Sequence, residues 1–131
     1  MRTLYQLDSI TQITADMGAS VIVSGSHGGV SSASYVVNAP NMPFAVFFND
    51  AGVGKDAAGI EALSILNQLG IMAFAYSHES ARIGQAADGL QSGVVSFANA
   101  CAQPAYGQWI GCAVRDLVKQ LRQTDRYPMR G

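Results

Sequence analysis

Three short apolar runs constrain the fold of this chain more than any other feature. They cover residues 19–23, 44–48 and 71–76, and apolar and polar residues do not alternate regularly within them. Mainly apolar runs of this length without alternation are typical of strands that are covered on both faces. We therefore expect three central strands of a buried, parallel sheet.

The segments between these runs carry helical signals. Residues 30–37 precede the turn residues Pro40 and Pro43, and they predict a short helix. Asp56 is expected to cap a second helix that Gly70 ends. Its apolar positions are spaced for one helical face: Ile60, Leu63, Leu66 and Leu69. Strands that alternate with helices predict an α/β fold, here a small three-layer Rossmann-like domain with a 3–4-stranded, mainly parallel sheet.

The flanking regions are less strongly patterned. Ser9 and Gln12 have capping-box spacing, which predicts a helix through Met17 that Gly18 closes in a left-handed turn. Periodicity alone leaves residues 93–101 open between a strand and a helix. The remaining expectations are a helix at 85–90, a loop around Trp109 at 104–111, an amphipathic helix at 112–122 and a frayed polar tail at 124–131. The length of 131 residues predicts one domain over 1–131.

Composition limits the partners of this domain. Charged residues make up 13% of the chain, against about 25% in an average soluble protein. So few charges leave much of the surface uncharged, and we expect a homo-oligomer in which copies cover part of it. The net charge is −1 and the sequence has no basic patch that could neutralise a phosphate backbone, so no nucleic-acid partner is expected.

Compartment is indicated only indirectly. Cys101 and Cys112 have no metal-type spacing and are expected to be reduced core residues. No apolar run reaches the roughly 18 residues of a membrane span, and residues 1–10 lack the apolar centre of a signal peptide. We therefore expect a cytoplasmic protein with no membrane partner.

Each apolar run ends in a polar, glycine-containing segment, and both histidines of the chain lie in these segments. The carboxyl ends of parallel strands share one edge of the sheet, where ligands commonly bind and helix N-termini attract anions. Histidine can take or give a proton near neutral pH, so His27 and His78, with Asp50, are the predicted proton-transfer residues. The predicted ligand-binding residues are Ser24, Gly28, Gly29, Asn49, Gly52, Gly54, Lys55, Ser77, Glu79, Ser80 and Arg82.

Simpler interpretations remain open for the same residues. Polar residues concentrate in loops whether or not a ligand binds, and either histidine could bond only a backbone carbonyl. If the segment from Ser77 is helical, His78 and Arg82 share one face; alternatively, Arg82 pairs with Glu79 on the surface. A metal held by the two histidines and an acid is a weaker alternative, because no HxH or HExxH pattern is present.

Two motifs near the strand ends are partial. Ser26 is central in a small-x-Ser-x-small sequence, Ser24 to Gly28, which is similar to the nucleophile elbow of serine hydrolases. Gly52 to Lys55 is similar to part of a phosphate-binding loop, but no Ser or Thr follows the lysine to hold magnesium.

A strand that ends Ser26-His27-Gly28, followed by one that ends Asp50-Ala51-Gly52, also resembles the cysteine peptidases of the caspase type. That resemblance covers about a third of the chain. It implies no peptidase activity, because Gly52 stands where the catalytic cysteine would be.

The combined expectation is a small-molecule enzyme, a hydrolase or a lyase with hydrolysis favoured, that acts on an anionic metabolite without a cofactor. Arg82 and Lys55 would orient the anionic group, and Asp50 would fix the tautomer of a histidine. Two alternatives stay open: a non-catalytic ligand-binding or oligomeric subunit protein, and a serine hydrolase that uses Ser26.

Overall fold

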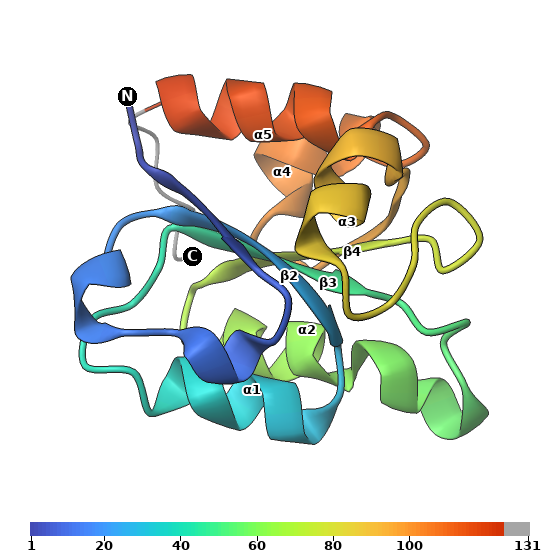
Figure 1. The fold of residues 1–131 in the computed structure, drawn as a ribbon, viewed down its shortest axis with the longest axis horizontal. Coiled ribbons are helices and arrows are strands. Elements are labelled where there is room, and N and C mark those ends of the chain that lie inside the picture. Colours follow the sequence, from blue (N-terminus) through green and yellow to red (C-terminus); the bar gives the residue numbers. More distant parts are fainter. Residues whose placement is uncertain (125–131) are drawn as a thin grey trace.

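The computed structural model describes residues 1–124, which form a five-stranded sheet with helices on both faces (Figure 1). The strands lie side by side in chain order, and their bounds are β1 Leu4–Leu7, β2 Val21–His27, β3 Ala45–Asn49, β4 Met72–Tyr76 and β5 Val95–Ala98. Strands β1 to β4 are parallel, and β5 is antiparallel to β4. The predicted α/β, three-layer class is confirmed, with five strands instead of three or four.

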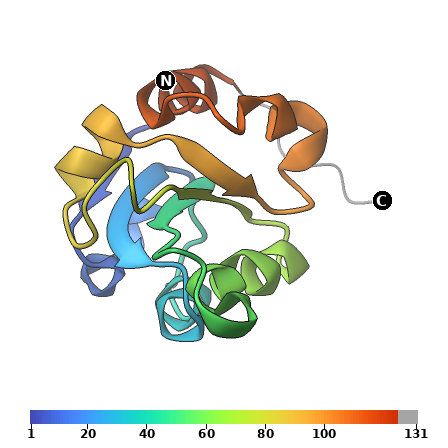
Figure 2. The ribbon, with the colours of Figure 1, turned by 90° about the vertical axis from the view of Figure 1, so that its right-hand side faces the viewer.

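Two layers of helices enclose the sheet, as Figure 2 shows with the sheet seen nearly end-on. Helices α1 (Val30–Val37) and α2 (Glu61–Gln68) cover one face, and both pack on alternate strand residues such as Ile22 and Phe48. The opposite face carries α3 (Ala86–Ser92), α4 (Gln103–Tyr106) and α5 (Val114–Gln123). Successive strand residues face opposite sides of the sheet. The apolar runs therefore contribute side chains to the hydrophobic cores on both faces.

Within residues 1–124, four 3-10 helices complete the connections: η1 Ile10–Gln12, η2 Ala15–Met17, η3 Lys55–Ile60 and η4 Gly107–Trp109. The expected helix over 9–17 is wrong, because it divides into η1 and η2, although the capping box of Ser9 and Gln12 forms. Gly18 has a φ of −61°, and the left-handed residue of this turn is Ala19, with a φ of 56°. The expected loop over 104–111 is mostly α4 and η4.

Two other expectations also need correction. Asp56 has a φ of 55°, so it lies inside η3 and does not cap α2, which begins at Glu61. The first apolar run ends at Val23, but strand β2 continues through Gly25 as far as His27, with a register shift after Val23. The open segment at 93–101 contains strand β5.

The strand order brings the ends of β2, β3 and β4 together. Neighbours in the sheet are also neighbours in sequence, and the order never reverses. Such a sheet lacks the crevice that a reversal opens in doubly wound folds. It still places residues 27, 49 and 76 along one border, which we call the carboxyl edge.

Within the described residues, no helix has both the length and the apolar character needed to cross a membrane. The expected frayed tail at 124–131 lies outside the described residues except for Thr124.

Candidate functional site

The carboxyl edge brings Asp50 and His78 together. Asn49 pairs with Tyr76 in the β3–β4 register, so the residues that follow the two strands emerge side by side. The Asp50 N–H donates to the Tyr76 carbonyl at 2.9 Å, which extends the ladder by one residue. The meeting of Asp50 and His78 therefore follows directly from parallel pairing of two predicted strands.

One oxygen of Asp50 holds the histidine. Asp50 Oδ1 accepts hydrogen bonds from the Gly52 N–H at 2.8 Å and the His78 N–H at 3.1 Å, and His78 Nδ1 lies 3.1 Å away. An ionised carboxylate can only accept, so the ring proton is on Nδ1 and neutral His78 leaves Nε2 with a lone pair. Asp50 is 5% exposed, whereas the His78 side chain is 49% exposed. The arrangement is a buried acid that orients a solvent-accessible base.

The surroundings keep Asp50 ionised. Burial raises the pKa of its carboxyl group, but the donors around it outweigh burial and the net pKa is lowered. In order of effect, these donors are the Gly52 N–H, the Ser96 hydroxyl, and the His78 N–H and ring. The Ser96 contact falls outside normal hydrogen-bond geometry, since its Oγ is buried without a partner that meets those limits.

His27 lies at the end of β2, opposite Asn49 in the register. Its ring is exposed and makes no hydrogen bond with any of residues 1–124. Its backbone carbonyl accepts from Ser32 Oγ at 2.6 Å, which ties the strand to α1. No hydrogen bond within the described part of the chain joins His27 to Asp50 or His78, so the structure unites only one of the two histidines with an acid.

The serines of β2 have structural partners. Ser24 is buried and its Oγ donates to the Phe47 carbonyl at 2.9 Å. Ser26 Oγ accepts from the Ile10 N–H at 2.9 Å, which joins the strand to η1. The elbow-like segment is therefore strand instead of a tight strand-to-helix turn, and the Ser26 hydroxyl is bonded away from Asp50 and His78.

The predicted glycine loops have different tasks. A Cβ at Gly28 would lie 2.9 Å from the Gly59 carbonyl oxygen, so this glycine permits close backbone packing. A Cβ at Gly29 would meet the movable ring of His27. Gly52 and Gly54 have φ values of 73° and 74°, which glycine adopts without strain. Lys55 follows them and is exposed.

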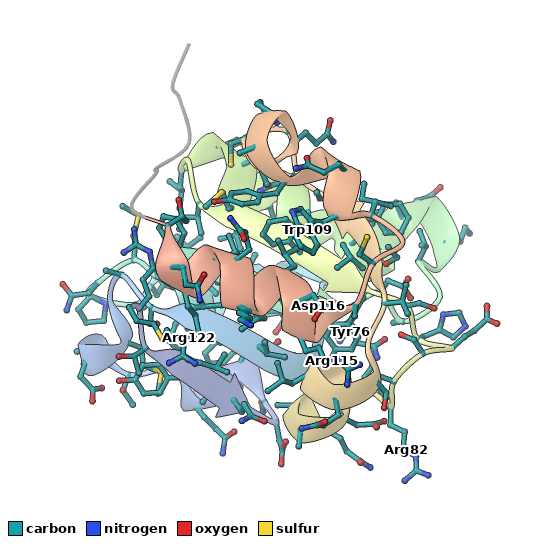
Figure 3. The ribbon with its side chains drawn as sticks, turned by 90° about the horizontal axis from the view of Figure 1, so that it is seen from above. Tyr76, Arg82, Trp109, Arg115, Asp116 and Arg122 are labelled. Atoms are coloured by element: carbon teal, nitrogen blue, oxygen red, sulfur yellow. The ribbon has the colours of Figure 1, made fainter. Side chains whose placement is uncertain are left out.

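The segment after β4 forms turns, so the hypothesis that a helical face unites His78 and Arg82 is not supported. Ser77 Oγ accepts from the Glu79 N–H, and Ser80 Oγ bridges the Ser77 carbonyl and the Val94 N–H. The side chain of Arg82 extends away from the fold (Figure 3) and makes no ion pair with Glu79 in the described region.

Asn49 is buried and serves the loops on either side of it. Its amide donates to the Ala81 carbonyl at 3.1 Å and accepts from the Ala51 N–H at 2.8 Å. These bonds fix the start of the loop that carries Gly52 and Lys55. Asn49 thus holds the loops after β3 and β4 in place at the carboxyl edge.

Two sizeable hollows lie away from Asp50 and His78. One of about 600 Å³ includes Gly18, Pro43 and Gly70 in its lining, and one of about 540 Å³ includes Arg2, Ser20 and Arg122. These residues belong to the opposite border of the sheet, where β2, β3 and β4 begin. We give more weight to the carboxyl edge. A hollow by itself provides no reacting group, whereas the Asp50–His78 pair provides an acid and a base.

Sequence reasoning missed Ser96, the β5 residue whose hydroxyl helps to lower the pKa of Asp50. The only sequence signal for Ser96 is that it is a polar residue within the apolar segment 93–101, for which periodicity does not distinguish a strand from a helix. Among residues 1–124, no cluster of three or more His, Cys, Asp or Glu side chains is arranged to hold a metal ion. Comparisons with protein-family models, with curated proteins and with solved structures find no significant match.

Proposed function

We propose that this chain is a small-molecule hydrolase in which Asp50 and His78 form the proton-transfer centre. The observation that carries the proposal is the contact of the buried Asp50 carboxylate with Nδ1 of a half-exposed imidazole. An acid in this position fixes the tautomer and steadies the positive charge that forms when the ring takes a proton. His78 Nε2 is then the general base.

The chemical steps follow from these two residues. A water molecule at Nε2 loses its proton to the ring as it attacks the carbonyl carbon of a substrate ester, thioester or amide. The new C–O bond forms, and the bond to the leaving group breaks when the ring returns the proton to that group. Asp50 remains ionised throughout, which agrees with the direction of its pKa.

The substrate class is argued from charge. Lys55 follows the glycine-rich residues 52–54 after Asp50 and extends into solvent, so it can approach a carboxylate or phosphate on the substrate. Arg82 would have to turn inward to help, because its side chain extends outward here. We therefore assign anion recognition first to Lys55. A lyase reaction would use the same base, which would remove a proton from carbon instead of water.

The experiment is a hydrolysis screen of the purified chain with small esters, thioesters, lactones and amides, each in a carboxylate-bearing and a neutral form. Wild-type protein should favour one anionic class. His78→Ala should lower turnover by about 100-fold or more, as expected for loss of a general base. Lys55→Ala should raise KM for the anionic form without a similar effect on the neutral one.

His27→Ala is the matched control, since His27 is exposed, lies on the same edge and lacks an acid partner. Equal losses for His27→Ala and His78→Ala would contradict the assigned role of Asp50. An anion that raises Tm but is never turned over would instead favour a non-catalytic ligand-binding protein. Labelling of Ser26 by a fluorophosphonate would favour the serine hydrolase alternative.

The homo-oligomer stays a prediction. Exposed apolar side chains on and beside α1, including Val30, Tyr35, Val37 and Met42, support it. Sedimentation equilibrium at several concentrations tests it, and a monomer throughout would contradict it.

A further inference from the structure

The hydroxyl of Ser96 is an unused polar group close to the proposed centre. Its Oγ is buried and has no hydrogen-bond partner of normal geometry within the described residues. A buried hydroxyl without a partner costs about 1–3 kcal/mol, so such groups are rare in folded proteins. Either Ser96 is a local defect or its hydroxyl serves a neighbour.

The sheet places Ser96 beside Asp50. Strand β5 runs antiparallel to β4, and their register shifts between Ala75 and Tyr76, opposite the stretch that contains Ser96. Asp50 leaves the sheet on the other side of β4, with its N–H on the Tyr76 carbonyl. The Ser96 hydroxyl is close enough to the carboxyl group to help lower its pKa. Ser96 and Asp50 therefore lie on opposite sides of the end of β4, one on each neighbouring strand.

One oxygen of the Asp50 carboxylate accepts no hydrogen bond from the described residues. The three described donors to Asp50, the Gly52 N–H and the two His78 groups, all end on Oδ1. No described hydrogen bond from residues 1–124 ends on Oδ2. A serine hydroxyl rotates freely about its C–O bond, so its proton can turn toward an acceptor beside it.

We propose that Ser96 is a positioning residue whose hydroxyl donates to the Asp50 carboxylate and thereby fixes the orientation that Asp50 imposes on His78. Its catalytic importance rests on the proposed hydrolase function, but the contact itself does not. A carboxylate held on both oxygens cannot rotate, so the ring nitrogen keeps its partner when the imidazole becomes charged. Ser96 itself is too buried to reach a substrate.

The test measures Asp50 and the His78 ring directly in the full chain, without a substrate. The Asp50 carboxyl carbon is followed by NMR against pH, and the ring nitrogens of His78 report the tautomer. Ser96→Ala should raise the Asp50 pKa by about one unit, the effect expected for loss of one charge-assisted hydrogen bond. It should also reduce the population of His78 with its proton on Nδ1.

Ser20→Ala is the matched control, because it removes another buried serine hydroxyl, one bonded to the Met17 carbonyl near the start of β2. It should leave both signals unchanged. The exposed charges on the flanking loops, Lys55, Asp56 and Glu79, are the same in every variant, so they cannot produce the difference.

A second pair of variants keeps the test possible if Ser96→Ala does not fold. Thr and Val are nearly isosteric and both suit a strand, so Ser96→Thr and Ser96→Val differ mainly in the hydroxyl. Thr should titrate like wild type, and Val should show the raised Asp50 pKa. Identical Asp50 titrations for Thr and Val, or for Ala and wild type, would overturn the proposal. A raised pKa in a chain that hydrolyses nothing would uphold the contact and reject the hydrolase.

Discussion

The end of β2 and the ends of β3 and β4 look alike in sequence but differ in structure. Each combines serine or asparagine, glycine and a histidine or acid. At the end of β2, these groups hold the fold together: Ser24 bonds β3, Ser26 bonds η1, and Gly28 packs on the Gly59 carbonyl. Beyond β3 and β4, a buried acid instead holds a half-exposed base.

This difference shows which polar residues are informative about a functional site. A glycine or serine near a strand end is informative only once its partners are known, because close packing uses the same residue types as ligand binding. A carboxylate that is buried and bonded to an exposed imidazole is more specific, since titratable groups with shifted pKa values and a close charge partner concentrate at functional sites. We therefore assign packing to the first region and propose chemistry only for the second.

The sharpest test of this contrast is Asp50→Ala. The substitution removes the acceptor for the Gly52 N–H, the His78 N–H and the His78 ring. We expect a loss of about 3 kcal/mol in the free energy of unfolding, measured by urea denaturation at pH 7. Asp116→Ala, an exposed acid in the first turn of α5, is the control and should cost less than about 1 kcal/mol. Equal costs would mean that Asp50 does not anchor its loop.

The packing region is tested by Gly25→Ala. An added Cβ would lie 2.6 Å from each of three backbone atoms, the Asp8 oxygen, the Gln85 nitrogen and the Gly84 carbonyl carbon. We expect a loss of about 2 kcal/mol, because backbone atoms cannot move aside as a side chain can. Gly107→Ala is the control, since its nearest neighbour would lie 3.6 Å away. Unchanged stability of Gly25→Ala would contradict the packing role of this segment.

The same contrast explains how far the sequence could predict the molecule. The central strands and α1 were predicted because apolar runs without alternation and helical spacing are local signals. Strand β1 was missed because Tyr5 and Gln6 interrupt its apolar pattern at an edge of the sheet. The helix expected over 9–17 failed because tertiary contacts of Ile10 and Met17 favour two short 3-10 turns.

The site was predictable to a similar extent. Asp50 and His78 each follow a recognisable strand, and parallel pairing then determines that they meet. The hydrogen-bond partner of Ser26 and the position of Ser96 depend on η1 and β5, two segments whose structure the local sequence did not determine. Local sequence therefore predicted that polar groups gather at the carboxyl edge. It did not predict which of those groups form structural hydrogen bonds with other segments of the fold.

A pH titration of stability sharpens the contrast further. The folded pKa of Asp50 lies below its unfolded value, so its ionised form stabilises the fold above about pH 4. That stabilisation is lost as the pH falls through the folded pKa. Wild type should exceed Asp50→Asn in stability at pH 7, and the difference should shrink as the solution becomes acidic. Urea denaturation from pH 7 to pH 3 measures this, and a constant difference would contradict the lowered pKa.

The smallest effect comes from the histidines themselves. His78→Ala removes one hydrogen bond to a buried carboxylate and should cost about 1 kcal/mol in the free energy of unfolding. His27→Ala removes an exposed ring without a hydrogen bond in the described structure, so its cost should stay within about 0.5 kcal/mol. Thermal and urea denaturation of both variants measure the difference. If His27→Ala cost more than His78→Ala, the end of β2 would hold a polar contact that the present geometry lacks, and the division between packing and chemistry would have to be redrawn.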